Sequence, residues 1–381
     1  MNLASKRTLV GAGATAAVWL VSVVLTRGQA ATETKPLMAE DVFKNVQVLK
    51  GTTVNEFMGT MGVFSASLGM SCEDCHNADD SSWANYAIDT SPKKQMARRM
   101  VTMMAAINKT NFGGRQMITC YTCHRGSDKP KVTANLANLY GTPPPEDPTD
   151  IITQARTAPM PEQVLDKYIQ AVGGAQRVAA LTSFAAKGSS IGYGPESEKR
   201  PVEIYAKAPG QRVTIIHTSS GDSTTLYDGR AAWIAAPHRP VGVLGLTGHD
   251  LDGAKLEAEL SFPARIKQAL TKWRVGVPST IDGRDVQAVQ GTSTNGATAT
   301  LYFDDESGML VRMIRYTDSP VGRIPTQIDY AEYREAAGVK LPVKWTVTWL
   351  GGRDNFEITD IQANVTVDAA RFGKPAVPSG R

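Results

Sequence analysis

Two short segments of the sequence combine paired cysteines with a histidine. Each contains the pattern Cys-x-x-Cys-His, first in SCEDCHNADD and again in CYTCHRG. Together they use every cysteine of the chain and two of its five histidines: Cys72, Cys75, His76, Cys120, Cys123 and His124. Residue types that bind metals or react through sulfur are therefore concentrated in two places.

Three kinds of chemistry use such a pattern. Two zinc knuckles are normally separated by roughly 12 to 20 residues, whereas 44 residues lie between Cys75 and Cys120 (120 − 75 − 1). Two disulfides suit an exported protein but do not explain the histidine after each pair. Covalent haem c explains both features, because the thiols bond the porphyrin vinyl groups and the next imidazole binds the iron. The pattern favours two haem c groups.

A six-coordinate haem needs a second axial ligand, and the sequence offers methionine for this position. The three histidines outside the motifs all follow residue 216, but eight of the thirteen methionines lie much earlier in the chain: Met58, Met61, Met70, Met96, Met100, Met103, Met104 and Met117. His/Met ligation fills both axial positions, which favours electron transfer over peroxide or oxygen chemistry. We therefore predict an electron carrier and not an enzyme.

The segment before the first motif predicts a helix that carries its distal ligand. Thr53 and Glu56 have the spacing of a capping box, and Gly69 marks the expected end. The apolar stripe of this helix consists of Phe57, Met61, Phe64 and Leu68. Met61 lies at the centre of the stripe and is the predicted ligand, with Met58 as the alternative.

A second helix is predicted before the second motif. It is expected to begin at Ser91 and Pro92 and to end before Gly113. One of its faces contains Met96, Met100, Met103 and Ile107. Met100 is the predicted ligand of the second haem and Met103 the alternative, because spacing does not separate them. The basic residues of this helix are expected to form its solvated face: Lys93, Lys94, Arg98 and Arg99.

The N-terminus predicts export from the cytoplasm. Lys6 and Arg7 precede an uncharged stretch, residues 8–26, and Arg27 follows it. Residues 1–30 are therefore interpreted as a signal peptide or an N-terminal membrane anchor. The net charge is only +4, from 41 basic and 37 acidic residues, which gives no electrostatic indication of a nucleic-acid partner.

The rest of the chain predicts a multidomain protein. Residues 35–140 are expected to form an all-α dihaem domain, and the proline-rich residues 141–161 an extended linker. Alternating apolar and polar residues in 162–381, with glycine-containing turns, predict a mainly antiparallel sheet with a few helices.

Three segments resemble the cytochrome c subunit of photosynthetic reaction centres: AEDVFKNVQVLKG, EFMGTMGVFSASLGMSCEDCH and ARRMVTMMAAINKTNFGGRQMITCYTCHRG. The resemblance covers about residues 38–130 and implies a methionine helix before each haem attachment. Photosynthetic members of the family typically carry four haems, whereas this chain has motifs for two. The β-rich half more weakly resembles the curved half-barrel of periplasmic lipoprotein-carrier proteins.

The motifs and the resemblance together predict a periplasmic dihaem cytochrome. Its expected partner is a redox protein or an electron-transfer complex of the membrane, with membrane association through residues 8–26. Two alternatives stay open at this point: a dihaem peroxidase-like enzyme, and a lipid-binding or partner-binding protein with a haem tether.

Overall fold

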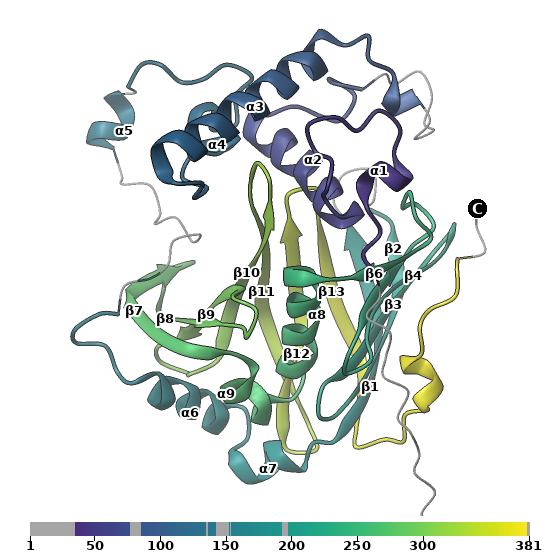
Figure 1. Cartoon of the computed structure of the whole chain (residues 1–381). Coiled ribbons are helices and arrows are strands. Elements are labelled where there is room, and N and C mark those ends of the chain that lie inside the picture. Colours follow the sequence, from purple (N-terminus) through teal and green to yellow (C-terminus); the bar gives the residue numbers. More distant parts are fainter. Residues whose placement is uncertain are drawn as a thin grey trace, which may run out of the picture. The chain divides into compact units, whose positions relative to one another are not determined.

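In the computed structural model, the described part of the chain is helical at its start and mainly β-stranded after residue 182 (Figure 1). It comprises residues 35–76, 85–134, 136–141, 152, 154–192 and 197–378. The predicted signal or anchor segment therefore lies outside the described residues. The first helices are α1 (Ala39–Val42), α2 (Val54–Leu68), the 3-10 turn η1 (Asn85–Ala87), α3 (Pro92–Phe112), α4 (Cys120–His124), α5 (Leu136–Tyr140), α6 (Pro161–Ala171) and α7 (Ala175–Ala180).

A single antiparallel sheet forms most of the second part. Its strands are β1 (Ser183–Gly192), β2 (Lys199–Lys207), β3 (Gln211–Thr218), β4 (Gly221–Tyr227), β5 (Ala232–Ala235), β6 (Val243–Leu246), β7 (Thr271–Ile281), β8 (Arg284–Thr292), β9 (Thr298–Asp304), β10 (Leu310–Ser319), β11 (Gly322–Ala336), β12 (Val339–Trp349) and β13 (Gly352–Ala363). The strand order is β6-β5-β4-β3-β2-β1-β13-β12-β11-β10-β9-β8-β7. Two meanders are thus joined where β1 pairs with β13, and the predicted curved antiparallel sheet is confirmed.

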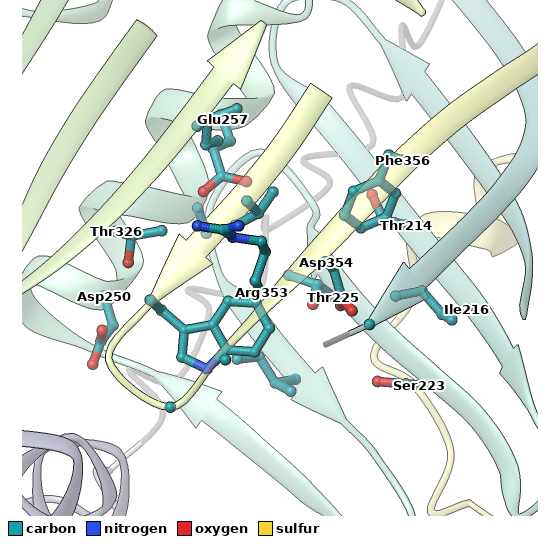
Figure 2. A pocket seen from close by; sticks show the side chains of 18 of the residues that line it. Thr214, Ile216, Ser223, Thr225, Asp250, Glu257, Thr326, Arg353, Asp354 and Phe356 are labelled. Atoms are coloured by element: carbon teal, nitrogen blue, oxygen red, sulfur yellow. The ribbon is translucent and has the colours of Figure 1, made fainter. Parts of the chain in front are cut away.

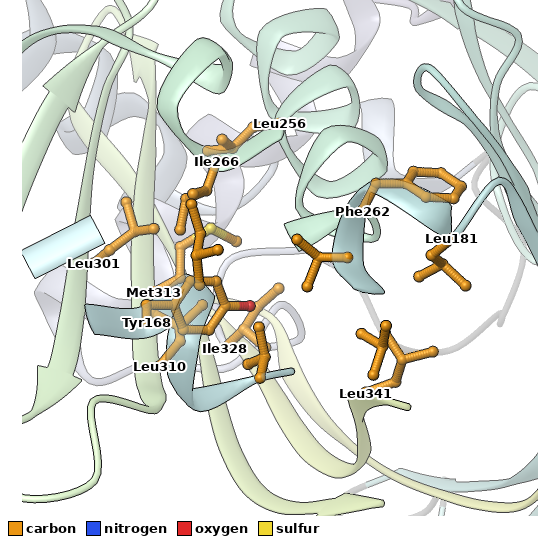
Figure 3. Close-up of a cluster of buried hydrophobic side chains, with 14 of the residues drawn as sticks. Tyr168, Leu181, Leu256, Phe262, Ile266, Leu301, Leu310, Met313, Ile328 and Leu341 are labelled. Carbon is orange, nitrogen blue, oxygen red and sulfur yellow. The ribbon is translucent and has the colours of Figure 1, made fainter. Parts of the chain in front are cut away.

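Helices line the inner side of the curved sheet (Figure 1). α8 (Gly248–Leu260), the 3-10 turn η3 (Pro263–Arg265) and α9 (Ile266–Ala269) interrupt the strands, and the turn η4 (Ala369–Phe372) follows them. Phe262, Ile266 and Leu256 meet apolar residues of α6 and of the strands in the main core (Figure 3). Burial of these side chains stabilises the sheet, since each contributes about 1.5 to 3 kcal/mol.

A smaller core lies among the first helices and includes a buried residue from the turn between β10 and β11. Val63 of α2 and Val101 and Met104 of α3 pack with Val321, which occupies the turn between β10 and β11 and is fully buried. The same hairpin accepts a hydrogen bond of 2.8 Å from the Gln116 side chain at the Ser319 carbonyl. Residues 35–381 form one compact unit.

Two glycines of α2 let this helix lie close to the sheet. The Cβ atom of any residue at position 59 would overlap the Cδ1 atom of Ile324 in β11. At Gly62 it would be 3.2 Å from the Cβ atom of Leu350, in the turn after β12. Gly59 and Gly62 therefore form a close-packing face of α2. The apolar pattern of the helix does not predict this face.

Candidate haem-attachment sites

The first motif forms a tight turn just after α2. Gly69 ends the helix in the left-handed conformation, with φ of 63°, and the His76 amide donates a 2.9 Å hydrogen bond to the Cys72 carbonyl. The Cys75 amide also donates to the Cys72 carbonyl, at 3.2 Å. This single helical turn brings both sulfur atoms and the imidazole into one short segment, as covalent haem attachment requires.

Hydrogen bonding fixes the tautomer of His76. Its Nδ1 atom lies 3.0 Å from the Tyr86 carbonyl oxygen, and its ring stacks on the Tyr86 ring with centroids 4.6 Å apart. Because a carbonyl only accepts, Nδ1 carries the proton and Nε2 keeps the lone pair that binds a metal. Burial lowers the pKa of His76, which favours the neutral imidazole.

The second motif is the helix α4 itself. Thr119 caps it in a reciprocal capping box with Thr122, and Arg125 ends it in the left-handed region, with φ of 50°. Nδ1 of His124 lies 3.0 Å from the Ser127 carbonyl oxygen. The second histidine therefore has the same tautomer as the first, again with Nε2 available for a metal.

No disulfide joins any of the four cysteines. Cys72 and Cys123 are exposed, whereas Cys75 and Cys120 are partly buried. Burial raises the pKa of Cys75 and raises the pKa of Cys120 to about 11. The two partly buried sulfurs are thus protonated near neutral pH.

The predicted methionine ligands differ in their surroundings. Met61 packs at the edge of the small helical core, near Phe57 and Phe64. Met58 lines a cavity that adjoins α2, and Met61 also borders it. Met58 and Met61 therefore both border the cavity, and Met61 also contacts the small helical core.

In α3, the buried residues are Val101, Met104 and Asn108. Met104 is therefore a core residue. Met100 is half-buried, and Met103 is 48% exposed. Met100 and Met103 thus remain the two candidates on the outer side of this helix.

Several large apolar side chains between residues 96 and 140 are exposed. They are Met96, Met103, Met117, Tyr121, Val132, Leu136, Leu139 and Tyr140. The paired thiols and the histidines that present Nε2 form a donor set that fits a covalently attached haem.

Backbone contacts hold the two motifs next to one another. The Gly126 amide donates a 2.9 Å hydrogen bond to the Ser67 carbonyl, near the end of α2. α2 also packs along α4. The residues before the first motif thus contact those after the second.

Two of the four basic residues of α3 do not form a solvated face, so that prediction was wrong for them. Lys94 donates hydrogen bonds of 2.8 Å and 2.7 Å to the Tyr86 and Ile88 carbonyls. Arg98 forms an ion pair of 2.6 Å with Asp89. Both hold the segment that supplies the hydrogen-bond acceptor of His76. No sequence signal linked Lys94 or Tyr86 to this histidine, because the contact depends on the fold.

A large cavity of ≈ 1220 Å³ lies between α2, α8 and the inner face of the sheet. Figure 2 shows polar side chains from several strands directed into it, including Thr214, Thr225 and Thr326. Arg315 and Glu257 form an ion pair of 2.9 Å on its wall. The sequence indicated no ligand-binding motif in this half of the chain, because the wall is assembled from distant strands.

Two further observations concern membranes and metals. None of the helices in the described ranges is both long and apolar enough to span a bilayer. Among the same residues, no group of three or more His, Cys, Asp or Glu side chains is arranged to hold a metal ion.

Comparison with known proteins supports the predicted resemblance. A family model described as photosynthetic reaction centre cytochrome C subunit matches residues 15–184. The photosynthetic reaction center cytochrome c subunit of Thermochromatium tepidum is 38% identical over 106 residues, which are 27% of this chain and 25% of that protein. The subunit of Rubrivivax gelatinosus is 35% identical over 97 residues, 24% of this chain and 25% of that protein. The chain thus matches a quarter of the length of these relatives.

The β-rich part gives other matches. A family of unknown function (DUF6544) matches residues 258–361. A LolA superfamily protein from Nitrosomonas europaea is similar at 15% identity, with a TM-score of 0.39 over 57% of this chain and 99% of the other. A DUF1329 family protein from Desulfovibrio piger has 11% identity and a TM-score of 0.39, over 56% of this chain and 96% of the other. Residues 15–184 resemble the photosynthetic reaction centre cytochrome c subunit, as the two motifs and their methionine helices predicted.

Proposed function

We propose that this chain is an exported dihaem c-type cytochrome that carries electrons to or from a redox complex at the membrane. Cys72 and Cys75 attach the first haem, with His76 and Met61 as axial ligands. The second site consists of Cys120, Cys123, His124 and Met100. Met58 and Met103 are the alternative axial ligands. The likeness to reaction centre cytochromes supports the assignment of a c-type cytochrome.

The observation that carries this proposal is the matched orientation of the two motif histidines. In each, Nδ1 lies 3.0 Å from a backbone carbonyl, of Tyr86 for His76 and of Ser127 for His124. In each histidine, this hydrogen bond at Nδ1 fixes the orientation of the ring and raises the basicity of Nε2, as is usual for metal-binding histidines. Bound haem c supplies a one-electron iron centre, whose potential is raised by methionine ligation.

Electron exchange between the two sites is part of the proposal. The 2.9 Å hydrogen bond from Gly126 to Ser67 joins the chain segments that flank the two motifs. This short connection supports two haems near enough to exchange electrons. In this arrangement the chain's own residues bind and orient the groups, and no catalytic residue is required.

The proposed location follows from the N-terminal segment, and the proposed partner from the likeness to reaction centre cytochromes. Residues 8–26 support export and, if they are retained, attachment to the membrane. The proposed location is the periplasmic side of the inner membrane, and the proposed partner is a membrane electron-transfer complex.

Mass spectrometry of the mature holoprotein tests the proposal. We expect a mass that includes two haem groups and reports whether the N-terminal segment is cleaved. The double variant Cys72→Ala/Cys75→Ala is expected to retain one haem, and Cys120→Ala/Cys123→Ala serves as its matched counterpart. A mass without haem would contradict the proposal.

Absorption spectra test ligation and the peroxidase alternative. Both haems are expected to be low-spin and six-coordinate in the oxidised and reduced states. A high-spin, five-coordinate haem with rapid peroxide turnover would contradict the assignment as an electron carrier and would indicate a peroxidase-like enzyme.

A further inference from the structure

The cavity inside the curved sheet reaches the first haem-attachment site. Its wall includes Met58 and Met61 of α2 and also Cys72, the first cysteine of the motif. A molecule in the cavity would therefore contact the same helix and cysteine that are assigned to the first haem.

The opposite wall suits a flat, largely apolar molecule. Ile328 and Tyr330 of β11, Trp345 of β12 and Phe356 of β13 all border the cavity. Trp345 and Phe356 stack with ring centroids 5.1 Å apart and an interplanar angle of 8°. Aromatic walls of this kind bind conjugated rings through face and edge contacts. The volume of ≈ 1220 Å³ is slightly above the usual range for a drug-sized ligand.

A hydrogen-bonding end lies beside α2. The Asn55 side chain donates a 2.6 Å hydrogen bond to Asp250 and accepts one of 3.2 Å from Arg239. All three residues line the cavity. This end offers an acceptor for a hydroxyl group and a donor for a carbonyl group, which are the two forms of a quinone oxygen.

The charges on the wall favour a neutral ligand. Among the described residues that line the cavity, five are arginines and five are carboxylates. Two of the pairs are in direct contact: Arg200 with Asp354 at 2.6 Å, and Arg315 with Glu257 at 2.9 Å. With the wall charges balanced in number, a hydroquinone enters the cavity without adding a net charge.

We propose that this cavity binds a hydroquinone that reduces the haems. The inference rests on the proposed electron-carrier function and names the class of its electron donor. The hydroquinone loses two electrons and two protons and becomes the quinone. Two ferric haems, attached at the proposed sites, would accept one electron each, and both protons would pass to water. The electron count of a dihaem protein therefore equals that of one hydroquinone.

Binding of decylubiquinone to the purified holoprotein, measured by isothermal titration calorimetry, is the first test. Thr326→Trp places a large ring in the cavity and is expected to weaken binding at least about tenfold. Gln327→Trp is the matched control, because the next residue of β11 does not line the cavity; its affinity is expected to stay within about twofold of wild type. Equal binding by both variants, or none by the wild type, would overturn the proposal.

Haem reduction by decylubiquinol under anaerobic conditions is the second measurement. Its rate is expected to fall in Thr326→Trp by about the factor lost in binding. If Thr326→Trp does not fold, as judged by circular dichroism, Thr214→Trp closes the cavity from β3 instead. If stearate binds and decylubiquinone does not, the occupant is an inert lipid and the proposal is wrong.

Dithionite reduction of the same samples tests the electron-carrier function separately from the assignment of a hydroquinone as the donor. Haem that dithionite reduces and decylubiquinol does not would contradict the donor assignment and leave the carrier function intact. A protein without haem would contradict the carrier function, whatever the calorimetry shows.

Discussion

A Cβ atom at position 69 would lie 2.5 Å from the carbonyl oxygen of Gly126. Gly69 ends α2 shortly before the first motif, and Gly126 follows the second motif by two residues. The amide of Gly126 in turn bonds to the Ser67 carbonyl. The two attachment segments are therefore in direct backbone contact at a place where only glycine fits.

The substitution Gly69→Ala is expected to destabilise the protein for two reasons. The residue has a φ of 63°, which costs a non-glycine residue about 1 kcal/mol, and its Cβ would meet backbone that cannot move aside. We expect a total loss of about 3 kcal/mol in the free energy of unfolding. Urea denaturation followed by circular dichroism measures it.

Gly113→Ala is the matched control for this clash. Gly113 ends α3 with a φ of 62°, and nothing lies within 4 Å of its would-be Cβ. Only the conformational cost of about 1 kcal/mol is expected there. Equal losses in the two variants would show that the contact with Gly126 carries no energy.

Replacing Met61 tests its assignment as an axial ligand. His/His ligation lowers a haem potential relative to His/Met, so Met61→His is expected to lower one of the two potentials by on the order of 0.1 V, within the roughly 0.8 V that axial ligands span. Spectroelectrochemical titration measures both haems. If Met58→His shifts a potential and Met61→His does not, Met58 is the ligand.

Lys94 is expected to matter far more than its neighbour Lys93. Lys94 bonds to the Tyr86 carbonyl, which is also the acceptor for His76, and its side chain is only 12% exposed. Lys94→Met is therefore expected to cost about 2 kcal/mol, the value of hydrogen bonds from a charged group. It should also shift the potential of the first haem, because the imidazole loses orientation.

The control is Lys93→Met. Lys93 is 47% exposed and lies 3.8 Å from Asp74, so its loss is expected to stay within about 0.5 kcal/mol. Similar potentials and stabilities for both variants would refute the role given to Lys94.

Val321 contributes to the core of the helical part although it lies in the turn between β10 and β11. Its side chain is fully buried, and Val321→Ala is expected to cost about 2 kcal/mol, since two methyl groups leave a cavity. Val377→Ala, at a residue that is 64% exposed, is expected to be neutral. Thermal unfolding followed at a haem absorption band would reveal the loss, and an unchanged midpoint would contradict it.

Asp250 gives the protein a pH dependence of defined sign. Burial raises its pKa above the ordinary 3.8, an effect that the Asn55 hydrogen bond and the charge of Arg315 oppose. Glu56 also raises this pKa, and Arg239 lowers it. Below pH 3.8 the group is protonated in both states and costs nothing. As the pH rises through the folded pKa, ionisation is harder in the folded state, so stability is lost.

Asp250→Asn removes this charge and keeps an oxygen that accepts from Asn55. The variant is expected to gain stability relative to wild type as the pH rises above about 4, with a plateau above the folded pKa. Urea denaturation at several pH values measures the difference. A difference that does not vary with pH would show that Asp250 does not titrate as described.

Local signals allowed the sequence to predict the helices around the motifs. The capping box of Thr53 and Glu56 is present, with reciprocal hydrogen bonds of 2.8 Å and 3.2 Å. Gly69 and Gly113 end α2 and α3 as predicted. Ser91 precedes α3 as expected, but its side chain makes no capping hydrogen bond. Such features depend on residues a few positions apart, so they can be predicted from a single sequence.

Contacts between distant residues could not be predicted in this way. Tyr86 and Ser127 are acceptors for the motif histidines through their backbone carbonyls, which every residue type possesses. The sequence alone does not distinguish Lys94 from the other basic residues of α3. Its hydrogen bonds to the Tyr86 and Ile88 carbonyls depend on the folded structure. The cavity is equally invisible in the sequence, because its wall comes from α2, α8 and many strands.

The hairpin between β10 and β11 also sets an order for folding. Gln116 and its acceptor Ser319 are 203 positions apart, and Val321 of the same hairpin belongs to the core of the first helices. That core is therefore completed only after the chain has been synthesised beyond β10, so the first helices do not reach their final packing on their own.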